Sequence, residues 1–542
     1  MRILPTCLCI AALGTASLTP TPAAANELSR SDKLRVLYSN QFAFDRNGVP
    51  LITVRIAEGQ GSTTIESTSP VRVFPDGEDG SEVLGGKRWR ITLRSARAAT
   101  LEHFVVLARE PTGELAGLQQ KMKQWRGRGA RCRMIETGTI FGLRGKVFDN
   151  RSYVLADGPY SSQKQALRAA ERYKQRHGLD RIATLPQLKR RPSATFEATD
   201  LDTSARVLVR DAIWFAPSGE AQLAVRGEDG RPAAYWGQIY VTVDRGGKLA
   251  VVNAAPANRL LAGLVPAEIF PSAPAAALRA QSVAARGELL AKLGTRHLVD
   301  PYLLCSTQHC QVYRGAGHEH PRTSKAVNAT KGMVLVRKDG RLVDTVYSAS
   351  CGGHTEHNDN VWPVKPDPNL RGTLDADGSP AYRGGITSSN IEAWLTSRPR
   401  AWCNHPRYNR DKFRWVAHLS VERAGRLLAE LGVGELRDIR VVSRGVSGRA
   451  SLVEVEGSRS RAQIRGELNI RRTLGNLRSS MFMVKTVTTT DGRVREFVFR
   501  GGGWGHGVGM CQTGAIGMAE ARKGHEMILQ HYYQGSALQP LY

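Results

Sequence analysis

The sequence predicts an α+β protein that is rich in β-structure and carries a small inserted α+β module. Short alternating apolar segments, punctuated by glycine and aspartate, occupy residues 34–93 and return after residue 193, which is typical of half-buried strands. An alanine-rich segment at residues 273–293 follows them and predicts a long helix. Between the two strand-rich parts, residues 101–179 alternate between strand-like and helix-like patterns, which indicates a separate unit.

Composition bounds the class of protein. The chain has 542 residues, of which 41% are hydrophobic and 23% charged, so it has enough apolar residues for about three folded units. The net charge is +27, from 76 basic and 49 acidic residues, and this favours polyanionic partners such as acidic wall polymers or lipid surfaces. The basic residues are dispersed and no zinc-finger or RNP pattern occurs, so we expect no nucleic-acid partner.

Residues 1–25 are predicted to be a secretory signal peptide. Arg2 precedes an apolar stretch that ends near Leu18, and the alanines at 23–25 suit cleavage after residue 25. The stretch is interrupted and shorter than the ~20 residues of a membrane-spanning helix, so we expect no integral membrane segment after cleavage. The mature protein should then be secreted, to the periplasm or the cell wall.

The mature chain divides into three predicted parts. Residues 26–98 form a β-rich lead-in, with strands at 34–38 and 89–93. Residues 99–185 form the inserted module, with a strand at 103–107, a helix at 115–125, a strand near Cys132, a strand at 152–156 and a helix from Gln163. Residues 189–192, with the sequence KRRP, are typical of a linker.

The third part, residues 193–542, contains the long helix. Strands are predicted at 238–244 and 249–253, and the helix follows with Ser272 as its N-cap. Residues 363–385 are rich in proline, glycine and aspartate and should form loops. A helix at 421–431 and strands at 439–443 and 451–455 come next.

Glu268 is the strongest candidate for chemistry. It lies in a predicted loop before the long helix, in the segment VPAEIFP, where apolar neighbours can desolvate its carboxyl group, raise its pKa and suit it to general-acid work. Arg279 and Arg286 are seven residues apart and share one helix face, from which a guanidinium could hold Glu268 or a substrate oxygen. The alternative is an ordinary solvated or capping glutamate.

Three further strings follow in a fixed order, namely CSTQHCQVY at 305–313, YSASCGGHTE at 347–356 and GWGHGVGMCQTGA at 503–515. Together with Glu268 and the string LRAQSVAAR at 278–286, they closely resemble the SpoIID/LytB family of sporulation and cell-wall proteins. The resemblance covers roughly residues 235–542. A shorter string, DGPYSSQKQAL at 157–167, resembles the end of a SPOR domain, a small sheet that binds denuded glycan strands; an unrelated α+β insertion is the alternative.

The resemblance implies a peptidoglycan lytic transglycosylase, which cleaves the MurNAc–GlcNAc bond of strands without stem peptides and leaves 1,6-anhydroMurNAc ends. Glu268 matches the family's catalytic glutamate, and Arg286 matches the arginine associated with it. A single carboxyl group can suffice, because the sugar's own hydroxyl replaces the water that a hydrolase must activate. The rival interpretations are a non-catalytic wall-binding protein that enhances an N-acetylmuramoyl-L-alanine amidase, and a structural spore or division protein.

Substrate contacts are expected from the three strings. The loop after Tyr347 resembles the family's cleft wall, and Trp504 offers an aromatic ring for stacking against a sugar. His506 is either a hydrogen-bond partner or a structural histidine. The predicted substrate-binding residues are Gln281, Gln311, Tyr313, Tyr347, Ser350, Gly353, Thr355, Trp504, His506 and Gln512.

Six cysteines remain after removal of the signal peptide, and they allow 15 pairings. In an oxidising compartment disulfides are expected, while the spacing of Cys305 and Cys310 suits either a small disulfide loop or shared metal ligation. Some SpoIID-like proteins bind zinc in this region through one histidine and two cysteines, which implies His297, Cys305 and Cys310 here. No cofactor is required for the reaction, so the metal would be structural. Cys511 stands where the family commonly has serine, and Cys351 and Cys403 are its candidate partners.

Overall fold

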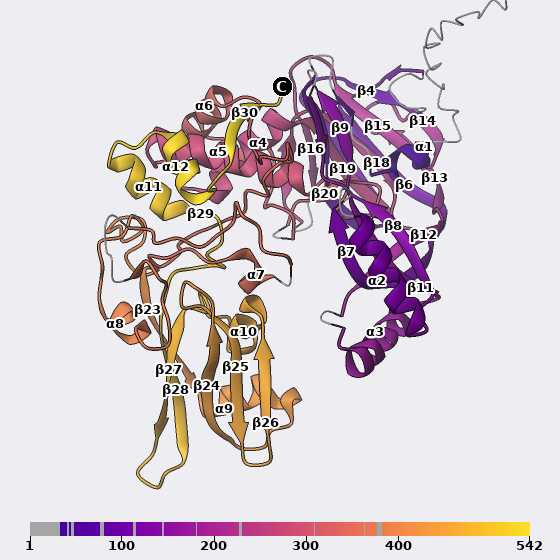
Figure 1. The fold of residues 1–542 in the computed structure, drawn as a ribbon. Coiled ribbons are helices and arrows are strands. Elements are labelled where there is room, and N and C mark those ends of the chain that lie inside the picture. The colour runs from indigo at the N-terminus through magenta and orange to yellow at the C-terminus, as the bar shows by residue number, and fades with distance from the viewer. Residues whose placement is uncertain are drawn as a thin grey trace, which may run out of the picture.

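The computed structural model describes residues 33–542 except 41–42, 45–47, 76–80, 112–114, 144–145, 180–181, 227–229, 308, 363 and 377–381. The predicted signal peptide and its cleavage site lie outside these residues. The fold has four parts: a β-rich body, a small α/β module beneath it, a helical body that carries the C-terminus, and a β-rich C-terminal lobe (Figure 1). The predicted α+β class with abundant strand is confirmed.

Two antiparallel sheets make up the β-rich body. One has the order β1-β2-β19-β18-β15-β4-β5, with β20 added in parallel beside β2, and the other has the order β14-β13-β6-β3-β16-β17. Inward side chains of both sheets, such as Val54 and Phe196, belong to one buried apolar cluster, so the sheets pack face to face. The strands are β1 (Ala43–Phe44), β2 (Pro50–Gln60), β3 (Ser62–Ser67), β4 (Val71–Phe74), β5 (Val83–Leu84), β6 (Arg88–Arg97), β13 (Ser193–Asp200), β14 (Arg206–Arg210), β15 (Ala212–Pro217), β16 (Leu223–Arg226), β17 (Pro232–Tyr235), β18 (Gln238–Val243), β19 (Leu249–Pro256) and β20 (Leu304–Cys305).

Residues 26–98 and 193–542, which the sequence analysis separates, share both of these sheets. Strand β2 pairs with β19, and β6 pairs with β13, so strands from before and after the inserted module alternate in space. The strand predicted at 34–38 is wrong, because these residues form helix α1 (Lys33–Leu37). Leu34 and Tyr38 are spaced for one helix face as well as for one strand face, and both are buried.

The inserted module is a four-stranded antiparallel sheet with two helices. Its strands have the order β12-β7-β11-β8. The predicted strands and helices are all present, and a hairpin, β9–β10, and a fourth strand, β12, are added. Lys189 and Arg190 belong to β12, so the linker predicted there is wrong. The elements are β7 (Thr100–Pro111), α2 (Leu115–Gly127), β8 (Cys132–Thr137), β9 (Ile140–Leu143), β10 (Lys146–Asp149), β11 (Ser152–Tyr160), α3 (Gln163–His177) and β12 (Thr184–Arg190).

The module is inserted between two paired strands. Arg97 at the end of β6 and Ser193 at the start of β13 are Cα partners in the antiparallel ladder, so the chain leaves and re-enters the body at one point. Helices α2 and α3 cover one face of the module's sheet, and the opposite face is also buried, around Phe104 and Val154 with Leu298 packed against them. The module also contacts the helical body through Asn150, whose Nδ2 donates to the carbonyl of Leu293, just after the long helix, at 3.1 Å.

The helical body surrounds the segment that contains Glu268. Helix α5 is buried along most of its length and contacts α6, α11 and α12. The predicted N-cap Ser272 is wrong: α5 begins after Pro274 and has no side-chain cap, while Ser272 Oγ lies 3.2 Å from the hydroxyl of Tyr408. The elements are α4 (Ala257–Glu268), α5 (Ala275–Ala291), α6 (Pro321–Ala329), β21 (Met333–Val336), β22 (Tyr347–Ser348), β29 (Met510–Cys511), α11 (Gln512–Glu520), α12 (His525–Tyr532) and β30 (Ala537–Pro540).

The C-terminal lobe consists of two three-stranded antiparallel sheets with their own apolar core (Figure 1). The predicted helix at 421–431 and strands at 439–443 and 451–455 are confirmed. The elements are α7 (Asn358–Val361), α8 (Ile391–Thr396), β23 (Arg414–Ser420), α9 (Val421–Leu428), η5 (Ala429–Leu431), β24 (Leu436–Arg444), β25 (Ala450–Gly457), β26 (Arg461–Arg465), α10 (Glu467–Thr473), β27 (Phe482–Thr488) and β28 (Val494–Gly502). Within the described part of the chain, no helix combines the length and apolar character needed to cross a bilayer.

Candidate active site

Glu268 lines a cavity between the helical body and the loops that lead to the C-terminal lobe. It is the last residue of α4, not a loop residue as the sequence suggested, and Ile269 turns the chain into an extended conformation directly after it. The cavity has a volume of about 270 Å³. It is lined by Pro266, Ala267, Glu268, Ile269, Phe270, Pro271, Ala349, Lys412, Gln512, Thr513 and Ile516.

The electrostatic environment of Glu268 favours the protonated carboxyl group. Burial raises its pKa to about 7, and the negative charge of Glu288 acts in the same direction. The backbone N–H of Val312, the charge of Lys292 and the hydroxyl of Tyr347 oppose this rise. A carboxyl group with a pKa near neutrality can both donate and accept a proton at physiological pH, as the sequence analysis anticipated.

A polar network connects this carboxyl group to the end of α5. Gln311 Nε2 donates to Glu288 Oε2 at 2.6 Å and lies 3.4 Å from the hydroxyl of Tyr347. Glu288 also pairs with Lys292, one helical turn later. Gln311 and Tyr347 therefore lie in the network next to Glu268. Glu288 and Lys292 were missed because nothing in the sequence distinguishes them from a common surface pair at this helical spacing.

Two short strands bring separate parts of the sequence to this cavity. β22 and β29 pair in parallel, with Tyr347 opposite Met510 and Ser348 opposite Cys511. The pairing places Gln512, the first residue of α11, beside Glu268: its Nε2 donates to the Glu268 carbonyl at 2.8 Å and to Gln281 Oε1 at 3.1 Å. The structure thus gathers Gln281 and Gln512, both predicted, at one place.

The rim of the site carries two exposed aromatic rings with a cation between them. Phe270 is 47% exposed and Trp504 is 39% exposed. Lys412 Nζ lies 5.4 Å from the ring centroid of Phe270 and 5.1 Å from that of Trp504. Arg478 is a second cation next to Trp504, with its guanidinium carbon 5.1 Å from the ring centroid. Of these residues only Trp504 was predicted.

Arg286 is placed differently from the expectation. Its side chain is 0% exposed, and its guanidinium donates to the carbonyl of Met333 at 2.9 Å and to that of Val327 at 3.4 Å. These bonds join α5 to α6 and β21, and a group without exposed surface does not reach a substrate oxygen. Arg286 is therefore a structural residue in this fold, and the expected contact with Glu268 or substrate is corrected.

Four predicted substrate contacts are also buried and satisfied within the protein. The hydroxyl of Tyr313 donates to Asn253 Oδ1 at 3.2 Å, inside the core. Ser350 Oγ accepts a hydrogen bond from Asn409 at 2.8 Å, and Thr355 Oγ1 donates to a neighbouring carbonyl. Gly353 has a φ of +103°, and an added Cβ would lie 2.6 Å from the ring of Trp394, so only glycine fits this turn. None of these four residues lines the cavity. Ser350, Gly353 and Thr355 shape the loop after β22.

His506 is half-buried and follows Trp504 by two residues. Its Nδ1 accepts a hydrogen bond from the backbone N–H of Val508, and its ring centroid lies 5.0 Å from that of Trp362. Burial and the charge of Arg449 lower the pKa of His506 to about 3, so the imidazole is neutral under ordinary conditions. Of the two readings left open by the sequence, this arrangement favours a structural histidine.

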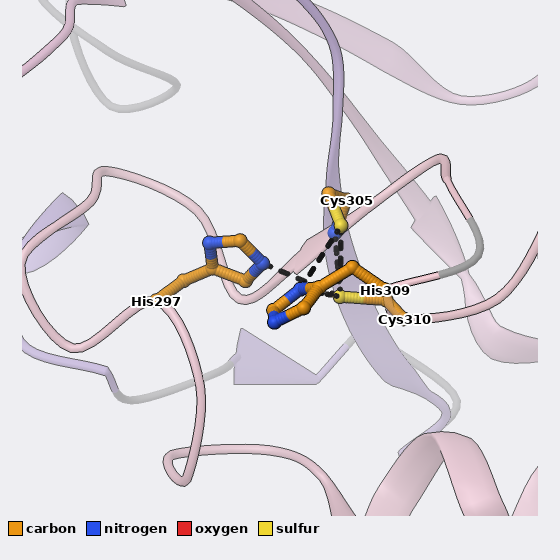
Figure 2. A group of neighbouring side chains, drawn as sticks. All are labelled: His297, Cys305, His309 and Cys310. Atoms are coloured by element: carbon orange, nitrogen blue, oxygen red, sulfur yellow. Dashed lines mark hydrogen bonds between the residues drawn. The ribbon is translucent and has the colours of Figure 1, made fainter. Parts of the chain in front are cut away.

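The predicted metal ligands come together, with one addition. His297, Cys305, His309 and Cys310 place their ligand atoms within 4.8 Å of one another (Figure 2). His297 Nε2 lies 3.3 Å from Cys310 Sγ, and the two sulfur atoms are 3.0 Å apart. His309, which the sequence analysis missed although it adjoins Cys310, lies with Nδ1 at 3.6 Å from each sulfur.

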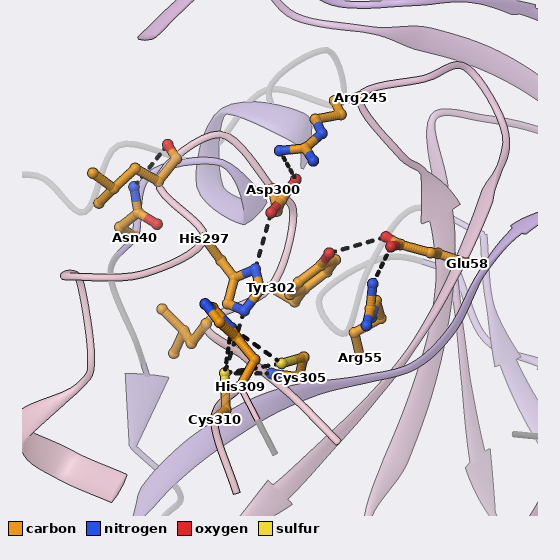
Figure 3. Close-up of polar contacts among 12 residues, drawn as sticks. Asn40, Arg55, Glu58, Arg245, His297, Asp300, Tyr302, Cys305, His309 and Cys310 are labelled. Atoms are coloured by element: carbon orange, nitrogen blue, oxygen red, sulfur yellow. Dashed lines mark hydrogen bonds and ion pairs between the residues drawn. The ribbon is translucent and has the colours of Figure 1, made fainter. Parts of the chain in front are cut away.

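The surroundings of this cluster fit a zinc ion. His297 Nδ1 is held by Asp300 Oδ2 at 3.0 Å, and Asp300 is in turn paired with Arg245, so the other ring nitrogen points toward the sulfurs (Figure 3). A carboxylate behind a histidine ligand is a common outer contact of zinc sites. Two thiols and two imidazoles are also the donor set that zinc prefers.

All six cysteines that follow the predicted signal peptide are free thiols in the structure. Cys132 lies alone in the inserted module, and Cys305 and Cys310 share the cluster just described. Cys511 lies beside Cys351 and Cys403, the two partners that the sequence suggested, and Asp375 completes a second group of ligand atoms within 4.8 Å of one another.

Comparison with known proteins places this site in a family. Residues 245–336, which contain Glu268 and α5, match the family described as Stage II sporulation protein, SpoIID. The chain contains a SpoIID domain. Residues 356–509, which include the C-terminal lobe, match a domain of unknown function, DUF8618. The resemblance to the SpoIID/LytB family that the sequence motifs indicated is thereby confirmed.

Individual relatives agree with this assignment. The SpoIID-containing chain is 29% identical over 288 residues to an uncharacterised protein of Brachyspira hyodysenteriae, covering 53% of the chain and 67% of that protein. It is 25% identical over 297 residues to the amidase enhancer of Bacillus subtilis, covering 51% of the chain and 40% of the enhancer. It is 25% identical over 303 residues to stage II sporulation protein D of Bacillus amyloliquefaciens, covering 52% of the chain and 74% of that protein. The chain therefore spans less than half the length of the amidase enhancer.

Among solved structures, an exported protein of Burkholderia pseudomallei aligns with 34% of the SpoIID-containing chain and 29% of its own, at 15% identity and a TM-score of 0.16. This likeness is too slight to support an argument.

The raised pKa of Glu268 makes stability depend on pH. The folded state keeps its proton to about pH 7, whereas the unfolded state releases it near its ordinary pKa, so wild type loses stability as pH rises between these values. Glu268→Gln removes the buried charge. At about pH 4 we expect wild type and Glu268→Gln to have equal free energies of unfolding. At about pH 8 we expect the free energy of unfolding of Glu268→Gln to exceed that of wild type by about 1–3 kcal/mol, measured by urea denaturation.

The exposed Glu430, in the C-terminal lobe, supplies the matched control for this measurement. Glu430→Gln should leave the difference from wild type independent of pH. If Glu268→Gln behaved in the same way, the burial of a titrating carboxyl group at this position would be refuted.

Proposed function

We propose that this SpoIID-containing protein is a peptidoglycan lytic transglycosylase that cleaves MurNAc–GlcNAc bonds of denuded glycan strands and leaves 1,6-anhydroMurNAc ends. The observation that carries the proposal is the Glu268 carboxyl group, which lines a cavity and has a pKa of about 7. The relatives named stage II sporulation protein D and amidase enhancer support a role in the cell wall.

In the first step, protonated Glu268 donates its proton to the glycosidic oxygen while the bond to the MurNAc anomeric carbon breaks. The resulting carboxylate lies close to the cationic sugar ring. It then takes the proton from the C6 hydroxyl of the same MurNAc, whose oxygen attacks the anomeric carbon and closes the anhydro ring. A single residue with a near-neutral pKa serves both steps, because it is an adequate acid and an adequate base at the same pH.

Glu288 has a supporting role in this scheme. It does not line the cavity, and it is held by Gln311 and Lys292, so it is not positioned as the second carboxylate of a hydrolase. Its negative charge raises the pKa of Glu268. It thereby helps to keep the acid protonated until the glycan arrives.

Replacement of the acid should abolish turnover and retain binding. For Glu268→Gln we expect anhydroMurNAc production from amidase-stripped peptidoglycan to fall by about 10²–10⁴-fold, since this is the usual contribution of positioned proton transfer. The measurement is mass spectrometry of muropeptides after incubation of mature protein with intact and with stripped peptidoglycan. Binding is checked by co-sedimentation with the same glycan.

Glu288→Gln distinguishes the roles of the two carboxylates in this experiment. It removes a like charge and leaves Lys292 unpaired, both of which lower the pKa of Glu268, so the alkaline limb of the rate profile should move to lower pH while turnover persists. Full activity of a soluble Glu268→Gln variant would refute the mechanism. Glycan that is bound but left uncut by wild type would favour the alternative, an enhancer of an N-acetylmuramoyl-L-alanine amidase.

The rim suggests how denuded strands are selected. Removal of the stem peptide by an amidase frees the lactyl carboxylate of MurNAc, and Lys412 is a cation placed between two exposed aromatic rings that suit sugar stacking. We propose that Lys412 pairs with this carboxylate. A strand that still carries peptides lacks the charge at this position.

Lys412→Met keeps the length and apolar stem of the side chain and removes the charge. We expect KM for stripped glycan to rise about fivefold with kcat within about twofold, because an exposed ion pair contributes up to about 1 kcal/mol. Steady-state release of anhydro-ended fragments measures both constants. Lys485→Met, an exposed lysine on β27, is the control that should change neither. An unchanged KM for Lys412→Met would exclude it from substrate selection.

We also propose that the inserted module binds glycan, as its SPOR-like string suggests. Its sheet face opposite the helices is buried, so a glycan would have to contact the helices or one of the edge strands, β8 or β12. Because Arg97 and Ser193 are paired, residues 98–192 can be replaced by an Asn-Gly turn. The shortened protein should fold, retain cleavage that depends on Glu268, and bind stripped glycan about tenfold more weakly in co-sedimentation. Unchanged binding by an active shortened protein would show that the module has another role.

We further propose that His297, Cys305, His309 and Cys310 hold a structural zinc ion. Bound there, zinc would cross-link the segment after α5 to β20 at the edge of the β-rich body. It would not take part in proton transfer, because none of the four ligand residues is among those that line the cavity with Glu268. The chemistry of the substrate and the predicted signal peptide together support secretion to the periplasm or cell wall.

A further inference from the structure

The second cysteine cluster joins four separate segments of the SpoIID-containing chain. Cys351 follows β22, Asp375 and Cys403 lie in the loops between β22 and β23, and Cys511 ends β29 at the start of α11. All four side chains are 0% exposed. We infer that Cys351, Asp375, Cys403 and Cys511 form a second zinc site that holds the loops against α11 and fixes one wall of the active-site cavity.

The ligand atoms lie close to the arrangement that a zinc ion requires. Cys351 Sγ lies 3.1 Å from Asp375 Oδ2 and 3.5 Å from Cys403 Sγ, and all four ligand atoms lie within 4.8 Å of one another. Two sulfurs bound to tetrahedral zinc at ~2.3 Å are about 3.8 Å apart, so small movements would complete the site. Three thiolates and a carboxylate are a donor set suited to zinc.

Contacts around the cluster orient the ligands. The hydroxyl of Tyr532 donates to Asp375 Oδ1 at 2.6 Å, and His531 Nε2 lies 3.5 Å from the same oxygen, which leaves Oδ2 facing the sulfurs. Cys511 Sγ accepts the backbone N–H groups of Cys351 at 3.1 Å and of Gly514 at 3.3 Å. Backbone donors to sulfur stabilise the thiolate that a metal needs.

The close packing explains one glycine of the last motif. A Cβ atom added to Gly514 would lie 2.1 Å from the Tyr532 hydroxyl and 2.7 Å from Asp375 Oδ2. Any larger residue would therefore push the carboxylate away from the sulfurs. Arg414, whose guanidinium donates to the carbonyl of Gly352 at 3.0 Å, offsets part of the negative charge next to Cys351.

A disulfide accounts for fewer of these features. A bond between Cys351 and Cys403 would require their sulfurs to move from 3.5 Å to about 2.05 Å apart and would leave Cys511 and Asp375 buried beside an apolar bridge. A buried carboxylate without a cation is costly. A metal ion uses all four groups.

The site adjoins the cavity. Ala349 and Thr513, which line it, are two residues from Cys351 and Cys511 respectively, and Thr513 Oγ1 donates to the Ala349 carbonyl at 2.6 Å. Bound zinc would therefore hold this wall in place while leaving the chemistry to Glu268. The inference stands independently of the reaction proposed above.

Zinc content of the mature protein tests the inference. After purification without chelators, wild type should hold about two zinc ions per chain by plasma mass spectrometry, and Cys305→Ser/Cys310→Ser should hold about one. Cys403→Ser/Cys511→Ser should also hold about one, and the variant with all four changes should hold none. Cys132→Ser, a change outside both clusters, should match wild type.

Two results would overturn the inference. One is a folded Cys305→Ser/Cys310→Ser protein without zinc that also fails to develop thiolate-to-metal absorption when Co²⁺ is added. The other is an intact mass, measured on wild type under denaturing conditions, that is lower by the two hydrogens of a disulfide mapped to this cluster. Because wild type alone decides the second result, poor folding of a variant does not leave the question open.

Discussion

The parallel pairing of β22 with β29 is the constraint on which the rest of the site depends. These strands have two residues each and lie far apart in the chain, yet they set Tyr347 against Met510 and Ser348 against Cys511. Their pairing starts α11 beside the end of α4, so Gln512 can reach the Glu268 carbonyl. It also brings together the cysteines on either side. So short a ladder contributes few hydrogen bonds, which is why buried contacts and the proposed metal around it matter.

Burial of Glu268 has an energetic consequence that the surrounding network moderates. A carboxyl group removed from water beside a second carboxylate holds its proton more firmly, and this weakens the folded state at high pH. Lys292 and Gln311 hold the carboxylate of Glu288, and Glu268 is the acid that lines the cavity. The fold is therefore less stable at high pH because of this one position, where an acid with a near-neutral pKa lines a cavity.

Much of the fold could be predicted from local pattern. The strands at β18 and β19, the helices α2 and α3, and the long helix α5 follow from periodicity and lie close to the predicted residues. Local pattern failed at α1, where Leu34 and Tyr38 fit either period. It also failed at Glu268, which was expected in a loop although α4 continues through Pro266 and ends at Glu268. It also missed β12, whose basic residues are typical of a linker but pair as an edge strand.

The sequence by itself determined the main candidates for chemistry, because an apolar setting for Glu268 and the closely spaced donors Cys305 and Cys310 are local properties. It also determined the family. Only the tertiary structure decided which residues meet. It placed Arg286 and Tyr313 in the core and outside the lining of the cavity, supplied Glu288 and His309 as neighbours, and set Asp375 among three cysteines. The physical reason is that a pKa shift or a metal site depends on distances between groups far apart in the chain, and packing fixes those distances.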